Sequence, residues 1–223
     1  MQADASGKRF SFLGNFVYVE GAYRYVGRGA LPFWSMPDAD DPAKKTIRNL
    51  DCAMSQVPTW FERKFEFTFP VEQYPNLCVR LRGTPARLEE TVRGVSHELL
   101  VRKSGEKWSA KEHVGHLLDL EPLWMARVED FLGEGDTLTA ADLSNRKTHE
   151  ANHNARELAK ILASFREARM HVVDRVWKSQ SFLFARTLLH PRLMQPMRLV
   201  DHLYFVAEHD DHHLARIWEM IQG

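Results

Sequence analysis

The chain has 223 residues, of which 44% are apolar and 27% are charged, proportions typical of a soluble globular protein. Lysine plus arginine equals aspartate plus glutamate at 30 each, so no overall field attracts nucleic acid or an anionic membrane. The two cysteines, Cys52 and Cys78, are too few for a disulfide scaffold or a zinc finger. We expect a soluble, cytoplasmic protein that binds neither nucleic acid nor membrane, with one domain and at most an appendage.

Residues 1–60 lack a regular pattern and are expected to form an N-terminal extension, either poorly ordered or docked on the rest of the chain. Within it, the aromatic-rich segment Phe10–Val26 has a second interpretation as a hairpin around Gly21, which would need a surface to pack on. A third interpretation places the true start of translation at Met54. The remaining residues, 61–223, are expected to form the folded domain.

Helical signals begin at about Val71. Thr84 and Pro85 followed by early acids predict a helix start, with that helix ending near Val101 and a helical approach before Gly83. Ser109 and Glu112 match a capping box, in which each side chain satisfies a free backbone N–H of the other residue. The helix they begin is expected to run to Gly133 with a kink at Pro122.

A polar connector of residues 133–153 separates these helices from two more. Apolar residues at helical spacing predict a third helix over about 154–178, and a loop containing His190 and Pro191 leads to a last helix over about 196–221. Polar residues of the connector, among them His149 and His153, favour a solvated loop, although they could also fold over a site. Four helices joined by loops predict an all-α, four-helix bundle.

The last helix carries His209 and His213 in a His-x-x-x-His pattern. Residues four apart stack on one helix face, so the two imidazoles can approach a single divalent metal at ~2.0–2.1 Å. With eleven histidines in the chain, chance placement on a solvated face is the plainer explanation. A third ligand could come from His113 or His116 on the second helix, and helical periodicity does not choose between them.

Two acids fall among apolar neighbours of the predicted helices. Asp210 projects near the centre of the apolar face of the last helix, and Glu121 does so on the second helix. An unpaired carboxylate there would be costly, so either Asp210 meets a cation or hydrogen-bond donors, or the helix is rotated. We predict that Glu121 and Asp210 support the site by orienting ligand imidazoles or accepting a proton.

The segments Trp108–Asp119 and Val206–Ile217 together resemble the second and last helices of DinB-like proteins. The resemblance extends over about residues 64–223, including the order of the four helices, and residues 1–63 have no counterpart in it. It implies a four-helix bundle of DinB-like type with one metal held by His116, His209 and His213. The metal is expected to be Zn, with Ni, Mn or Fe as alternatives, because imidazole does not select among them.

The resemblance further implies a metal-dependent enzyme of thiol transferase or hydrolase type that acts on a small-molecule substrate, with a small thiol as a candidate cofactor. It also implies pairing into a homodimer through helix faces. The competing interpretation is a non-catalytic metal-binding or stress-response module. DNA binding is a third interpretation, and the zero net charge and the absence of a basic helix face speak against it.

Overall fold

The structure, a computed structural model, describes residues 2–3, 9–13, 16–19, 22–25 and 57–222. The chain divides into two compact units, residues 1–56 and 57–223, which are described separately. Much of the predicted N-terminal extension, including Met54 and Cys52, lies outside the described residues. Among the residues described, no helix has the combination of length and apolar character that crossing a membrane requires.

The N-terminal unit contains four short antiparallel strands paired in sequence order. Two of them flank Gly21 and pair through Val19 and Ala22, which agrees with the hairpin interpretation of the aromatic-rich segment. The strands are β1 (Gln2–Ala3), β2 (Arg9–Leu13), β3 (Phe16–Val19) and β4 (Ala22–Tyr25).

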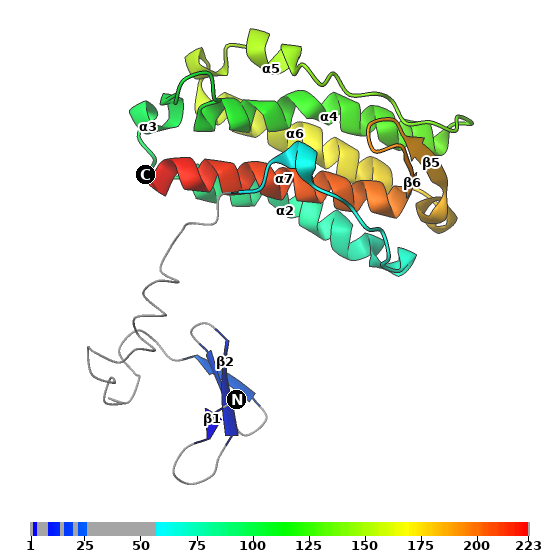
Figure 1. Cartoon of the computed structure of the whole chain (residues 1–223), viewed down its shortest axis with the longest axis horizontal. Helices are drawn as coiled ribbons and strands as arrows, with labels where there is room; N and C mark the ends of the chain where they lie inside the picture. The colour runs from blue at the N-terminus through cyan, green and yellow to red at the C-terminus, as the bar shows by residue number, and fades with distance from the viewer. Residues whose placement is uncertain (1, 4–8, 14–15, 20–21, 26–56, 223) are drawn as a thin grey trace. The chain divides into compact units, whose positions relative to one another are not determined.

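The second unit is a four-helix bundle, as predicted (Figure 1). Its long helices are α2 (Tyr74–Val92), α4 (Ala110–Leu132), α6 (Leu158–Trp177) and α7 (Leu199–Gln222). Helices α2 and α4 each pack against both α6 and α7. The shorter elements of this unit are η1 (Trp60–Glu62), η2 (Val71–Gln73), α3 (His97–Val101), α5 (Arg146–Glu150), η3 (His153–Ala155), η4 (Ser181–Ala185), β5 (Thr187–His190) and β6 (Gln195–Arg198).

The long helices form two parallel pairs. Helices α4 and α6 run in the same direction, because the residue numbers of their ion-pair partners increase together. Glu121 pairs with Arg169, and Glu129 pairs with Arg175. The same order holds along α2 and α7. A parallel pair needs a long return connection, and residues 133–157 supply it by running back along α4, with α5 packed on that helix (Figure 1).

The first predicted helix boundary is wrong. Helix α2 begins at Tyr74 and continues through Thr84 and Pro85 to Val92, and α3 is a separate helix. Pro85 has no backbone N–H and so removes one hydrogen bond from the helix. Packing of the helix against α6 and α7 outweighs the loss of that bond. The chain instead leaves the helix next to Gly94, whose φ of +71° is a conformation that glycine adopts without strain.

The start of α4 agrees with the prediction. Ser109 Oγ accepts a hydrogen bond from the N–H of Glu112, and the Glu112 carboxylate accepts one from the N–H of Ser109. Both orphan donors are thereby satisfied, which fixes the first turn. This turn matters for function because His113 and His116 follow within two turns.

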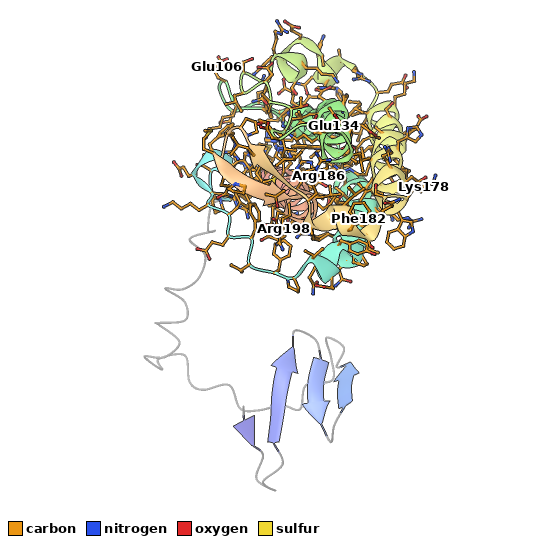
Figure 2. All side chains as sticks on the ribbon, turned by 90° about the vertical axis from the view of Figure 1, so that its right-hand side faces the viewer. Glu106, Glu134, Lys178, Phe182, Arg186 and Arg198 are labelled. Carbon is orange, nitrogen blue, oxygen red and sulfur yellow. The ribbon has the colours of Figure 1, made fainter. Side chains whose placement is uncertain are left out.

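The loop predicted around His190 and Pro191 is instead a two-stranded hairpin of β5 and β6. Arg186, just before it, donates hydrogen bonds to the carbonyl oxygens of Phe131, Gly133 and Gly135 at the end of α4 (Figure 2). The last carbonyls of a helix have no partner within the helix, so this arginine satisfies the carbonyl of Phe131 and also attaches the hairpin to the segment that follows α4.

The bundle interior has two apolar clusters. One contains Leu81, Trp124, Val172 and Ala207, and the other contains residues such as Leu88, Leu117, Phe165 and Ile217. On each long helix, at least one buried polar residue lies between the residues of the two clusters. These polar residues are Thr84, Asp119, Glu121, Arg169, His209, Asp210 and His213. A polar layer therefore crosses the core, and it contains the predicted site.

Candidate metal centre

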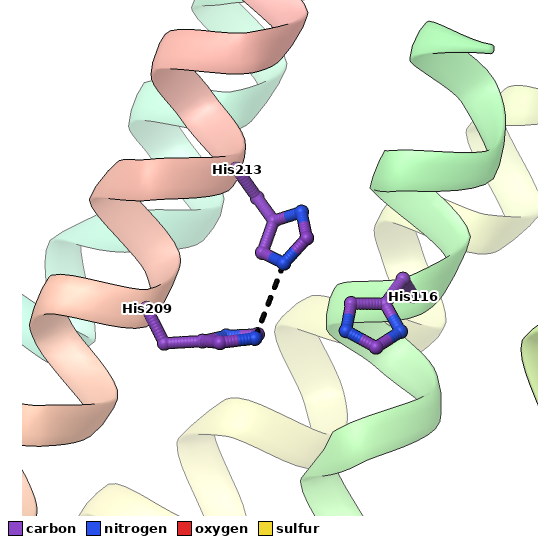
Figure 3. A group of neighbouring side chains, drawn as sticks. All are labelled: His116, His209 and His213. Carbon is purple, nitrogen blue, oxygen red and sulfur yellow. Dashed lines mark hydrogen bonds between the residues drawn. The ribbon is translucent and has the colours of Figure 1, made fainter. Parts of the chain in front are cut away.

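The three predicted metal ligands meet between α4 and α7 (Figure 3). One ring nitrogen of each of His116, His209 and His213 lies within 4.8 Å of the others. The Nε2 atoms of His209 and His213 are 3.1 Å apart. Two nitrogens bound tetrahedrally to zinc at ~2.05 Å would lie ~3.3 Å apart, so the pair already has the spacing of metal ligands.

All three imidazoles are neutral at physiological pH. Burial lowers the pKa of His116 to about 4 and, with the neighbouring histidines, holds the pKa values of His209 and His213 well below their usual range. Their exposed fractions are only 3%, 4% and 6%. A neutral imidazole keeps a lone pair free for a metal, so this donor set fits a divalent transition metal.

The tautomer of His116 is set by residues outside the cluster. Its Nδ1 lies 3.0 Å from Thr148 Oγ1, and that hydroxyl donates to Asp119 Oδ2, also at 3.0 Å. His153 Nε2 donates to the same carboxylate oxygen at 2.7 Å. Because ionised Asp119 can only accept, the hydroxyl proton points to Asp119, and His116 Nδ1 becomes the donor. The Nε2 lone pair of His116 is then available to a metal.

The connector therefore folds over the site, although its composition favoured a solvated loop. Thr148 and His153 are 4% and 1% exposed, while His149 and Asn152 are exposed. Sequence reasoning missed the roles of Asp119 and Thr148. The i, i+3 spacing of His116 and Asp119 was a usable signal, because such residues share a helix face. No local signal marked Thr148.

We expect Thr148→Val to weaken metal binding by roughly 10–100-fold, because the hydroxyl that links His116 to Asp119 is lost without a change in side-chain shape. Competition with a chromogenic chelator measures this affinity. Thr137→Val is the matched control, since Thr137 is exposed in the same connector. Equal affinities in both variants would show that the Thr148 link does not support the ligand.

His113 lies behind His213 and not in the cluster. The Nδ1 atoms of the two residues are 2.8 Å apart, so one must donate to the other. When the Nε2 lone pairs of His209 and His213 face a metal, the Nδ1 atom of His213 carries a proton and donates a hydrogen bond to His113. His113 is neutral, because burial lowers its pKa to about 3. His113 thus orients His213, while His116 supplies the third converging nitrogen.

Glu121 and Asp210 both bind Arg169, and all three side chains are buried to within 2%. Arg169 donates to Glu121 at 2.6 Å and also binds Asp210, which accepts a further hydrogen bond from Thr84 at 2.9 Å. Asp210 therefore meets a cation, one of the two alternatives for its position. Among the described contacts, none joins either carboxylate directly to the three histidines, so their predicted supporting role would act through Arg169.

Gly115 lies where the connector packs closely against α4. A Cβ atom there would lie 2.2 Å from the ring of His153. We expect Gly115→Ala to lower the free energy of unfolding by about 1–3 kcal/mol and to weaken metal binding, because His153 must move away from Asp119. Gly83 lies inside α2 with nothing within 4 Å of its position for a Cβ. Gly83→Ala should therefore stabilise by about 0.5–1 kcal/mol in the same urea titration, and similar values for the two variants would contradict this account.

Aromatic rings surround the histidines. Trp108 lies 4.7 Å from the ring of His116, and Trp60 lies 5.0 Å from the ring of His209, both between centroids. His212 is half-buried, and its ring centroid lies 5.7 Å from that of Trp60. A surface cavity of about 560 Å³ reaches Trp108, and its other lining residues are Leu99, Arg102, Lys103, Ser104, Lys107, Arg216, Glu219 and Met220.

Comparison with known proteins agrees with this fold. A solved structure of YfiT from Bacillus subtilis, described as a probable metal-dependent hydrolase with an unusual four-helix bundle topology, superposes with a TM-score of 0.63. The two chains are 21% identical, and the match covers 72% of this chain and 93% of YfiT. No curated protein matches the sequence. Residues 80–217 match the pattern of the DinB superfamily, and the chain therefore belongs to that family.

Proposed function

We propose that this protein is a metal-dependent enzyme in which His116, His209 and His213 hold one divalent ion that acts on a small-molecule substrate. The observation that carries the proposal is the convergence of three neutral imidazoles without a carboxylate or thiolate beside them in the described part of the chain. A divalent ion bound by three neutral ligands keeps its charge and an open position, and lowers the pKa of a water or thiol that binds it.

The surrounding residues have separate tasks in this proposal. Asp119 and Thr148 fix the orientation of His116, and His113 does the same for His213. Trp60 and Trp124 pack near His209, with ring centroids 5.0 and 5.6 Å away, and help to keep this 4% exposed residue from bulk water. A dry site strengthens the electrostatic effect of every charge in it.

Hydrolysis is the reaction type that we propose first. The description of YfiT as a probable hydrolase supports this choice, and zinc suits an all-imidazole set. Transfer of a thiol is the alternative reaction at the same site. Location in the cytoplasm, expected from the low cysteine count, and pairing into a homodimer, expected from the family resemblance, are further proposals.

A non-catalytic metal-binding module is the second candidate, and the low exposure of the three histidines favours it. The two functions differ in coordination, because a structural zinc site has four protein ligands and a catalytic one has three. The absorption spectrum of the cobalt-substituted protein separates them. An enzyme should show a spectrum that changes when azide is added, and a closed site should not respond.

Turnover tests the enzyme proposal itself. Metal-free protein and protein reloaded with Zn, Ni, Mn or Fe should be compared on a panel of ester, amide and thiol-transfer substrates. We expect activity only in a reloaded form, and Thr148→Val should reduce it. Activity that survives complete metal removal would contradict the proposal.

A further inference from the structure

Five buried side-chain nitrogens in the described part of the chain have no hydrogen-bond partner, and they gather in one region. They are Trp124 Nε1, Arg192 Nη2, His209 Nδ1 and both ring nitrogens of His202. The ring of Trp124 lies 5.8 Å from that of His202 and 5.6 Å from that of His209. Buried polar groups are rarely unpaired, so a cluster of them next to a metal ligand requires an explanation.

The same region contains two arginines that form no ion pair with any described carboxylate, in contrast to Arg169. Arg127 is 1% exposed and binds only the carbonyl of Thr139 and Nε2 of His190. Its guanidinium lies 5.5 Å from the ring of Trp124, and that of Arg192 lies 5.7 Å from the ring of Phe205. Burial lowers the pKa of Arg127 only to about 10, so it stays charged. The interior between α4, α7 and the β5–β6 turn is therefore electropositive.

Four of the five unpaired nitrogens are donors when His209 Nε2 faces the metal, and the fifth, the second ring nitrogen of neutral His202, is an acceptor. Tryptophan Nε1 and the arginine nitrogens can only donate, and a neutral histidine has one N–H to offer. Burial and the charge of Arg127 keep His202 neutral by lowering its pKa well below the usual range. Donors therefore outnumber acceptors in this region, and an acceptor with negative charge would also balance the arginines, which water would not do.

We propose that a carboxylate or similar oxyanion of the substrate binds among Trp124, Arg192 and His202, beside His209. This proposal rests on the proposed function and specifies its substrate class as small organic anions. Trp60 and Phe205, 5.2 Å apart between ring centroids, lie at the same place. Trp60 is also 5.0 Å from His209. The apolar part of the ligand would pack on these rings, which favours an aromatic or branched acid.

Benzoate is a suitable probe, with benzamide as its neutral counterpart of the same shape. The measurement is the shift of the Trp124 indole N–H resonance in the zinc-loaded full-length protein, assigned with Trp124→Phe. We expect benzoate to shift this resonance and benzamide to leave it in place. Arg192→Gln should bind benzoate about 10–100-fold more weakly, since a charge-assisted hydrogen bond is lost.

Arg93→Gln is the matched control, because Arg93 lies on the surface and pairs only with Glu90. It should bind benzoate as the wild type does. No shift with benzoate, an equal shift with benzamide, or unchanged affinity in Arg192→Gln would overturn the proposal. Should Arg192→Gln fail to fold, Trp124→Phe serves in its place. Its affinity for benzoate, measured by calorimetry, is expected to be lower than that of the wild type.

Repeating the titration on metal-free protein separates this proposal from the proposed function. If the protein binds benzoate but never retains metal, the result would support the anion site and contradict the proposal of a metal-dependent enzyme. If the protein binds one metal ion but no benzoate, the result would support the metal site and contradict the anion site.

Discussion

Replacing His209 with alanine is expected to abolish metal binding, with the affinity falling by at least about a thousandfold. Two imidazoles rarely hold a divalent metal, and His209 and His213 share the tightest spacing in the cluster, 3.1 Å between Nε2 atoms. Burial already keeps the rings neutral, so the loss reflects a missing ligand and not a change of protonation. Metal content after dialysis, measured by elemental analysis, gives the result directly.

His212→Ala is the control for this experiment. His212 lies on the same helix between the two ligands, is half-buried, and is not among the converging nitrogens. It should retain full metal occupancy, as should the wild type. Full occupancy in His209→Ala would show that the histidine cluster is not the metal site.

Replacing Arg169 with methionine is expected to cost about 3–5 kcal/mol in the free energy of unfolding. Arg169 is fully buried and forms ion pairs with two buried acids, Glu121 and Asp210, that come from different helices. Without it, both acids must either stay charged in the core or take up protons. Urea denaturation followed by circular dichroism measures the loss.

Arg166→Met provides the comparison on the same helix. Arg166 makes a two-point ion pair with Glu89, but both side chains are substantially exposed. An exposed pair contributes about 0–1 kcal/mol, so this variant should differ little from the wild type. A small effect of Arg169→Met, similar to that of Arg166→Met, would mean that the buried ion cluster does not stabilise the bundle.

The bundle could be predicted because its signals are local. The capping box at Ser109, the helical spacing of apolar residues and the polar connectors each depend on residues within a few turns. The exception is α2, where Thr84 and Pro85 imitate a helix start inside a helix. Tertiary packing on α6 and α7 overrode that local signal, and the sequence alone gives no measure of it. The β5–β6 hairpin was missed because its strands are four residues each.

The site could be predicted in part. The spacing of His209 and His213 placed them on one face, but the choice of His116 over His113 came from the family resemblance and not from periodicity. The sequence placed Asp210 and Glu121 among apolar residues and, for Asp210, left open whether it meets a partner or the helix is rotated. Their partner Arg169 lies 41 and 48 residues from them in sequence. Contacts of that kind, like those of Thr148 and Arg192, depend on the packed structure.

The central claim is a single metal ion held by His116, His209 and His213. Its most direct test is elemental analysis of the full chain purified without an affinity tag or added metal. The account predicts about one equivalent of Zn, Ni, Mn or Fe per chain. No metal in this protein, even after incubation with each ion and dialysis, would contradict it.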